Sequence, residues 1–186
     1  MKKESRILGV SDGFSEDRHP KRAMEIIGVV FRGGHWLEGV MTTQMRRNGL
    51  NPTAQIARMI TSSPHFEQIR LIMTDGLISG NHSLVDIKSL HKKTGIPVIA
   101  VSRRTRGTKS LKAAMKGVGE PISILLTPEK KPLEIYHVGL DSADAKSVVK
   151  MSCTVDIPEP IRVARLFAST FNELLASDSK KIKLRS

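Results

Sequence analysis

The chain has very little cysteine and few aromatic residues, and both shortages exclude kinds of protein. One cysteine in 186 residues rules out an intramolecular disulfide framework and any zinc site built from several cysteines. That residue, Cys153, has no obvious base nearby in the sequence, so we expect a small, partly buried side chain rather than a nucleophile. Aromatic residues make up 4% of the chain, which argues against a platform that stacks a run of bases.

Long apolar segments are also missing. No stretch reaches the roughly 20 apolar residues that span a bilayer. The amino-terminal sequence lacks the apolar core of a signal peptide. We therefore expect a soluble, cytoplasmic protein that has no membrane partner.

Positive charge is what the chain has in excess. Lys and Arg number 30 against 18 Asp and Glu, which gives a formal net charge of +12. An excess of this size favours a polyanionic partner, above all nucleic acid. The alternative is a basic surface that only balances an acidic or salty cytoplasm. With base stacking disfavoured, contact with the nucleic-acid backbone or its cleavage is the expected kind of function.

The length of the chain predicts one domain. A chain of 186 residues is long enough for a core of two or three layers and short for two substantial domains. We expect this single domain to cover residues 1–177. The basic segment 178–186, which includes Lys180, Lys181, Lys183 and Arg185, is predicted to be a mobile tail.

The first half of the chain predicts three strands and a helix. Apolar and β-branched runs predict strands over Arg6–Val10, Met24–Phe31 and Trp36–Thr43. The pair Gly33–Gly34 joins the second and third strands in a short connection, which predicts an antiparallel hairpin. Asn51 precedes a proline and an i, i+3, i+4 apolar stripe, so a helix is predicted to begin there.

From Ile69 onwards strands alternate with helices, and the connections that follow Ile69–Met73 and Ile96–Val101 imply parallel pairing and right-handed crossovers. The predicted strands are Ile69–Met73, Ile96–Val101, Ile122–Leu126 and Leu133–Val138. The predicted helices are one that ends at Gly95, then Lys109–Lys116, Ala143–Met151, and a last one that follows Ile157-Pro158-Glu159-Pro160. The apolar side of that last helix is predicted to consist of Val163, Leu166, Phe167, Phe171, Leu174 and Leu175.

This order of elements predicts an α/β fold of the ribonuclease H-like type. Such a fold has a mixed sheet, with three antiparallel strands followed by strand and helix alternation, and helices on both faces. In that architecture the first strand and the strand after the first helix are neighbours in the middle of the sheet. Ser11-Asp12 stands at the end of the first of these strands and Asp75 at the end of the second, so we expect these positions to meet at one edge.

A pair of carboxylates at this edge suggests a metal site. Carboxylate oxygens suit hard cations such as Mg²⁺ or Mn²⁺. Two ions about 3.5 to 4 Å apart would clamp the attacking and leaving oxygens of a phosphodiester displacement. The plainer alternative is that Thr74-Asp75-Gly76 is only a turn before the next helix, because Asp and Gly are common turn residues.

Short motifs spread along the chain carry a family resemblance. They are Ile7–Gly13, Val30–Gly34, Ile72–Gly76 with Leu84–Ile87 behind it, Gly95–Ile99 and Ile157–Ala164. Together, and over nearly the whole chain, they resemble the archaeal endonuclease dU family, distant relatives of endonuclease V. The resemblance implies a ribonuclease H-like fold and a DNA repair endonuclease that uses Mg²⁺ or Mn²⁺ to cleave a phosphodiester near deaminated bases such as deoxyuridine.

The chain departs from the family pattern at three acids. Members usually carry Gly-x-Asp-Asp-Gly in the first motif, and Ser11 stands at the first of those two acids. Asn48 and Asn51 stand where the segment after the third strand usually has acids. Because successive side chains of a strand point to opposite faces, Asp12 replaces a carboxylate at position 11 only if the backbone turns there.

Two hypotheses follow from the matches and the departures. In the first, the protein is an endonuclease whose catalytic residues and metal ligands are Asp12 and Asp75, helped by Asp86 or Glu38. In the second, it is a catalytically weakened relative that binds nucleic acid, expected to be DNA, without cleaving it. The second follows because each missing carboxylate removes a negative charge from beside a divalent cation.

A basic loop follows the strand Ile96–Val101 and is expected at the same edge of the sheet as Asp75. A nucleic-acid backbone that runs across the site would pass over this loop. The alternative is a solvated surface loop without a ligand. The predicted nucleic-acid-binding residues are Arg103, Arg104, Arg106 and Lys109.

Overall fold

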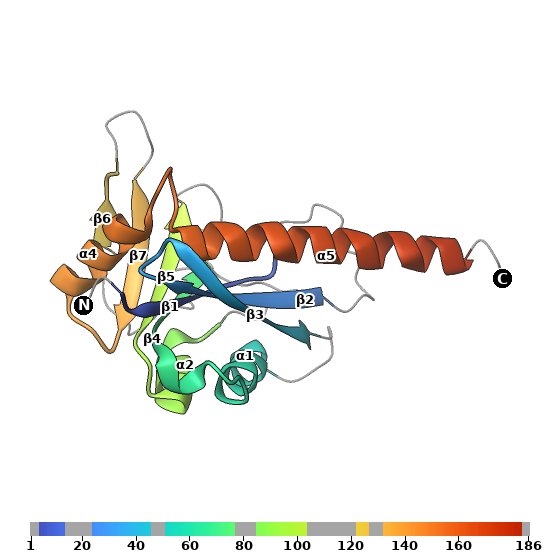
Figure 1. The fold of residues 1–186 in the computed structure, drawn as a ribbon, viewed down its shortest axis with the longest axis horizontal. Coiled ribbons are helices and arrows are strands. Elements are labelled where there is room, and N and C mark those ends of the chain that lie inside the picture. Colours follow the sequence, from blue (N-terminus) through green and yellow to red (C-terminus); the bar gives the residue numbers. More distant parts are fainter. Residues whose placement is uncertain are drawn as a thin grey trace.

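The computed structural model describes residues 4–13, 24–45, 51–76, 85–103, 122–126 and 132–183. These residues contain one mixed sheet of seven strands in the order β3-β2-β1-β4-β5-β7-β6 (Figure 1). Strands β1, β4 and β5 are parallel to one another, and the other neighbouring pairs are antiparallel. The strands are β1 (Arg6–Ser11), β2 (Met24–Arg32), β3 (Trp36–Met45), β4 (Ile69–Asp75), β5 (Val98–Arg103), β6 (Ile122–Ile124) and β7 (Leu133–Val138).

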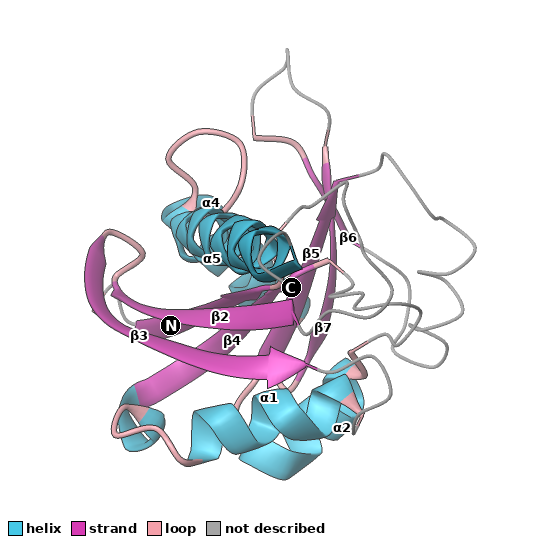
Figure 2. Cartoon of the chain, turned by 90° about the vertical axis from the view of Figure 1, so that its right-hand side faces the viewer, coloured by secondary structure: helices cyan, strands magenta, loops and turns pink. Residues whose placement is uncertain are grey.

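Helices cover both faces of the sheet (Figure 2). On one face lie α1 (Pro52–Thr61) and α2 (Ile87–Thr94), and a short 3₁₀ turn, η1 (Phe66–Gln68), leads into β4. On the other face lie α4 (Ser142–Ser152) and α5 (Glu159–Lys183). Among the described residues, no helix combines the length and the apolar character that crossing a membrane requires.

The central strands are buried on both sides, which explains why they read as unbroken apolar runs in the sequence. In β1, Ile7 packs into the core under α4 and α5, and its neighbour Leu8 packs into the core under α1 and α2. In β4, Leu71 packs into the core under α4 and α5, and Ile72 packs into the core under α1 and α2. All four side chains are fully buried.

The arrangement confirms the predicted α/β, ribonuclease H-like fold. The strand Leu133–Val138 has the predicted bounds, and the hairpin turns at Gly33 and Gly34, whose φ angles are +62° and +78°. Only glycine adopts such angles at little cost, so the glycine pair is what allows the tight return. The predicted helix Lys109–Lys116 lies outside the described residues.

The face that the last helix turns to the sheet matches the predicted one only in part: Val163 and Phe167 are partly buried against the core beside β2, as predicted. The fully buried Ala164 and Ala168 pack with the apolar side chains of β2. Leu166, Phe171 and Leu174, which the sequence placed on the core side, are exposed. Two alanines let the helix come close to the strand, and this close approach leaves the larger apolar residues beside the contact or beyond it.

The same helix is longer than the sequence indicated. It continues through Lys183, so it includes residues 178–183 of the segment that the sequence assigned to a tail. Figure 1 shows this helix extending past the edge of the sheet. The division into a domain of residues 1–177 and a mobile tail stays a prediction.

Side-chain caps fix where α1 and α2 begin. Asn51 accepts a hydrogen bond of 2.9 Å from the backbone N–H of Thr53, as the sequence predicted for the start of α1. Asp86 accepts hydrogen bonds from the backbone N–H groups of Lys88 and Ser89 at the start of α2. Such caps satisfy N–H groups that have no partner inside the helix.

The Asp86 cap should contribute to stability in a pH-dependent way. Burial opposes ionisation, but the hydrogen bonds from Ser89 and Lys88 outweigh it and hold the pKa of Asp86 below its ordinary value. The folded state therefore favours the carboxylate. The stabilisation is complete above the unfolded-state pKa of about 3.9 and is lost as the pH falls through the lower folded-state value.

We expect Asp86→Ala to lower the free energy of unfolding by about 1 kcal/mol at neutral pH and by less under acidic conditions. Urea unfolding at neutral pH and at about pH 3 measures the difference. Asp86→Asn keeps a capping oxygen without the charge and should lose less. An equal loss for Asp86→Ala at both pH values would contradict a contribution from the carboxylate charge.

Candidate functional site

Ser11 and Asp75 meet at the carboxyl ends of two neighbouring strands. β1 and β4 run parallel in the middle of the sheet, with Val10 opposite Thr74. The buried Ser11 hydroxyl donates a hydrogen bond of 2.9 Å to Oδ2 of Asp75. The two strand ends therefore lie together, with a hydroxyl group at the position where the family pattern has its first acid.

Two glycines of the first motif allow α5 to lie directly against β1. A Cβ atom at Gly9 would lie 2.2 Å from the backbone carbonyl carbon of Pro160, and one at Gly13 would lie 2.5 Å from the backbone nitrogen of Ser169. Gly13 also has a φ angle of +72°, which other residues rarely adopt. Any side chain at Gly9 or Gly13 would push the helix away from the strand, so these glycines set the distance between them.

This close approach brings Arg165 of α5 onto Asp75. Arg165 Nε donates a hydrogen bond of 2.7 Å to Asp75 Oδ2, and its terminal Nη2 pairs with Oδ1. The hydrogen bond to Asp75 is the main cause that raises the pKa of Arg165; burial opposes it, and the Asp75 charge adds to it. The Arg165 side chain is 32% exposed and the Asp75 side chain is 16% exposed, so this ion pair with two hydrogen bonds is largely shielded from water.

Asp12 lies just past the end of β1 and is 7% exposed. After the interactions with Asp75, the charges of Asp156 and Asp12 also raise the pKa of Arg165. The backbone carbonyl of Asp12 accepts a hydrogen bond of 2.9 Å from Nδ2 of Asn172 on α5. Asp12 is thus held against the same helix that supplies Arg165.

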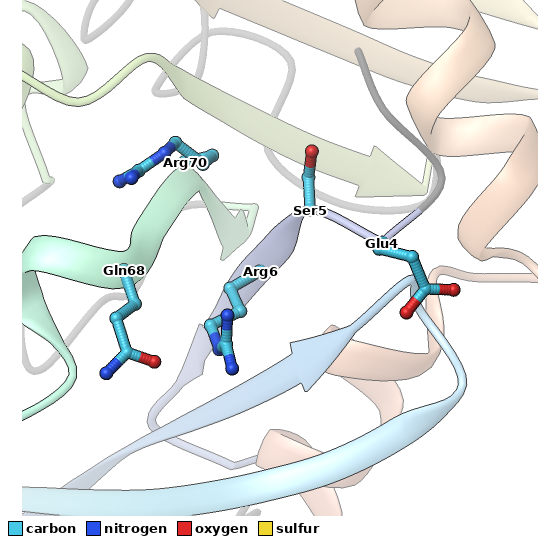
Figure 3. A pocket seen from close by; sticks show the side chains of 5 residues that line it. All are labelled: Glu4, Ser5, Arg6, Gln68 and Arg70. Carbon is cyan, nitrogen blue, oxygen red and sulfur yellow. The ribbon is translucent and has the colours of Figure 1, made fainter.

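Glu38, one of the predicted additional ligands, lies at the end of the sheet opposite to Asp75, measured along the strands. It accepts a hydrogen bond of 2.6 Å from Arg6, the first residue of β1, and pairs with Arg32 at 2.8 Å. Five residues of extended strand, about 16 Å, separate Arg6 from Ser11. A cavity of about 240 Å³ opens beside Arg6 at this far edge, where the Arg70 side chain points away from Arg6 (Figure 3).

Other predicted positions have structural roles or lie outside the described residues. The Asp86 and Asn51 side chains are engaged in the caps of α2 and α1. The half-buried Cys153 has a pKa raised to about 12, by burial first and then by the charges of Asp156 and Glu159, so its thiol stays protonated at neutral pH. Asn48 lies outside the described residues.

The predicted nucleic-acid contacts begin at the same edge as Asp75. Strand β5 runs beside β4, with Val101 opposite Asp75, and it ends at Arg103. The chain therefore leaves the sheet next to the site, as the order of elements predicted. Arg104, Arg106 and Lys109 lie outside the described residues, and contact of these three residues and of Arg103 with phosphates stays a prediction.

Arg165 is the residue of this site that sequence reasoning missed. A signal for it was present, since Ile161, Ala164, Arg165 and Ala168 follow an i, i+3, i+4, i+7 spacing. That spacing places the arginine on the side of the helix that faces the sheet. A charged residue on a buried face requires a partner of opposite charge. The larger apolar residues on the other faces of α5 concealed this pattern.

The residues at the carboxyl ends of β1 and β4, a place that we call the carboxyl edge, do not fit the two-metal site that the sequence suggested. A pair of divalent ions needs several oxygen ligands. Across the described ranges, no group of three or more His, Cys, Asp and Glu side chains is placed to hold a metal ion. Both oxygens of Asp75, the most central carboxylate, already accept hydrogen bonds from a cation.

Comparisons with known proteins agree with the fold and identify the family. A family model described as endonuclease dU matches residues 3–172. A UPF0215 protein of Methanothermobacter thermautotrophicus is 37% identical over 181 residues, which cover 91% of this chain and 88% of that protein.

Solved structures share the architecture. A protein of unknown function from Archaeoglobus fulgidus has a TM-score of 0.72 and 29% identity, and the match covers 90% of this chain and 98% of that one. Endonuclease V of Ciona intestinalis, in complex with a DNA that contains an inosine, has a TM-score of 0.65 and 16% identity, with 92% and 86% covered. The protein therefore has the ribonuclease H-like fold that is also seen in endonuclease V. Because the family model matches most of its length, the chain belongs to the endonuclease dU family.

The ion pair between Arg165 and Asp75 should stabilise the protein measurably. In a double-mutant cycle with Arg165→Ala and Asp75→Ala, we expect a coupling of about 1.5–3 kcal/mol, because the hydrogen bonds are charge-assisted and shielded. Urea unfolding of the four proteins measures it. The pair Arg162 and Glu159 on the same helix is a control, since Arg162 is more exposed and a coupling of about 0.2–1 kcal/mol is expected. A coupling for Arg165 and Asp75 no larger than that of the control pair would contradict the expectation.

Proposed function

We propose that this protein binds nucleic acid, with DNA as its expected partner, and does not cleave it through a metal ion held by Asp75. The observation that carries the proposal is the pairing of both Asp75 oxygens with Arg165. Ser11 adds a further hydrogen bond to the same carboxylate. A ligand that is fully engaged in this way is withdrawn from metal chemistry unless the guanidinium leaves.

Electrostatics favours the engaged state over a metal-bound one. A divalent ion next to Asp75 would lie beside the positive charge of Arg165, and like charges at such a distance repel strongly in a partly buried site. Displacing Arg165 would in turn leave a shielded guanidinium without its partner. The hydroxyl of Ser11 is a weaker metal ligand than the carboxylate of the family pattern, so its binding to a metal ion would offset little of the free energy lost when Arg165 is displaced.

Binding to nucleic acid rests on independent features. The net charge of +12 favours a polyanion, and the family is named for an endonuclease. The chain also leaves β5 at Arg103, beside the site, and continues into the basic sequence that contains Arg104 and Arg106. These residues would hold the phosphate backbone without reading its sequence.

The second candidate is a metal-dependent endonuclease that acts near deaminated bases, with Asp12 and Asp75 as metal ligands. One observation favours it: Asp12 is nearly buried and directly follows Ser11, whose hydroxyl bonds to Asp75, so both acids lie at the same two strand ends. Two carboxylates and water can suffice for one Mg²⁺ ion. The two candidates differ in whether the wild-type protein cleaves.

A nicking assay separates these candidates. We expect no metal-dependent nicking of a labelled duplex with one deoxyuridine, in Mg²⁺, Mn²⁺ or EDTA, although a gel-shift assay detects binding of the same duplex. Asp75→Asn tests the site, and Glu38→Gln makes the same charge change at the opposite edge as a control. Nicking that needs metal, is lost in Asp75→Asn and persists in Glu38→Gln would overturn the proposal and establish the endonuclease.

The basic sequence after β5 should supply phosphate contacts. We expect the triple variant Arg103→Ala, Arg104→Ala and Arg106→Ala to weaken binding to any duplex and to flatten the slope of log K against log salt by up to about 2.7. The control removes three exposed positive charges elsewhere, with Arg58→Ala, Lys92→Ala and Lys93→Ala on α1 and α2. A slope that the first triple leaves unchanged would show that these arginines do not contact phosphates.

A further inference from the structure

Arg165 has a place that is unusual for an arginine of a surface helix. Its Nε and Nη2 groups both bond to Asp75, while the Ser11 hydroxyl donates to Oδ2 of the same carboxylate. Every oxygen of Asp75 thus has a donor, and the strongest donor is a cation. The arrangement is that of a carboxylate bound to a positive ion, with the guanidinium as the ion.

The surroundings of Arg165 need a cation. Asp75 is in direct contact with Arg165, and Asp12 is held against the same helix by the hydrogen bond from Asn172 to its backbone carbonyl. The Asp75 side chain is 16% exposed, and Asp12 as a whole residue is 7% exposed. Water therefore screens the repulsion between these two acids incompletely. Without a positive charge between them, these acids would oppose one another and the packing of α5 on β1.

We propose that Arg165 is the built-in counter-ion of the carboxyl edge and takes the place of a divalent cation there. Removal of its guanidinium group would convert Asp75 and Asp12 into a binding site for Mn²⁺ or Mg²⁺. This inference rests on the proposed function, since it explains why the Asp75 carboxylate is withdrawn from metal binding in the wild-type protein.

The chemistry of the exposed ligand set suits this class of ion. Carboxylate and hydroxyl oxygens are hard ligands, and Mg²⁺ typically uses one or two carboxylates while it keeps several water molecules. The absence of a larger group of His, Cys, Asp and Glu side chains among the described residues is therefore compatible with one ion, bound modestly. A soft or tetrahedral ion such as Zn²⁺ has no matching donors here.

A titration of the full chain with Mn²⁺ tests the inference. Binding is measured as the loss of the electron paramagnetic resonance signal of the free ion. We expect Arg165→Ala to bind Mn²⁺ at least about tenfold more tightly than the wild-type protein, because a positive charge next to the site is gone. Arg165→Gln removes the charge with a smaller change in volume and should show the same gain. Its circular dichroism spectrum and unfolding transition establish that it is folded.

Three controls locate the effect. Arg165→Lys keeps a positive charge and should bind no more Mn²⁺ than the wild type. Arg162→Ala removes an arginine one turn earlier on α5, where it pairs with Glu159, and should also show no gain. Asp75→Asn, added to Arg165→Gln, should abolish the gain. These results together would support a counter-ion role that depends on charge and position.

Two results would overturn the inference. One is a folded Arg165→Gln protein that binds Mn²⁺ no better than the wild type. The other is a wild-type protein that already binds Mn²⁺ as tightly as the variant and through Asp75. Failure of the proposed function is detected separately, since it requires the wild-type protein to nick DNA or fail to bind it. A wild type that binds without nicking, with no Mn²⁺ gain in the variants, would refute the counter-ion role alone.

Discussion

The contact between α5 and β1 is the constraint on which the rest of the site depends. At Gly9 the backbone of Pro160 lies where a Cβ atom would be, so the helix and the strand touch without an intervening side chain. From that contact, Arg165 lies in the second turn of the helix and reaches Asp75, while Asn172 reaches the carbonyl of Asp12. A displacement of the helix by the thickness of one methyl group would break both interactions, because hydrogen bonds weaken steeply with distance.

Much of the fold could be predicted, because patterns of residues that are close together in the chain determine it. Runs such as residues 26–31 are apolar because they are buried within a sheet, and the pair Gly33 and Gly34 permits a tight return. Asn51 could be assigned as a cap for the same local reason, since its side chain bonds two residues ahead. The neighbouring positions of Ser11 and Asp75 then followed from the order of strands in a ribonuclease H-like sheet.

The occupant of the site could not be predicted in this way, because it depends on how a distant helix is rotated. Large apolar residues normally mark the buried side of a helix, but α5 buries Ala164 and Ala168 and leaves Phe171 exposed. Glycine on the strand and alanine on the helix reduce the separation, and only that reduced separation allows Arg165 to reach Asp75. A pattern of apolar residues reports hydrophobic area and not the distance between backbones, so it placed Val163 and Phe167 correctly but put Leu166, Phe171 and Leu174 on the buried side and missed the alanines.

An arginine can balance the charge of the carboxyl edge without doing the chemistry of a metal ion. Both cations can pair with the Asp75 carboxylate, and the guanidinium does so without depending on a supply of metal, because it is part of the chain. A divalent ion, however, also binds water and lowers the pKa of that water, which makes it a better nucleophile. A guanidinium group offers only N–H donors and has no open coordination position. Arg165 in the place of a metal ion therefore keeps a positive charge beside Asp75 and the docking of α5, but it lacks the means of activating water.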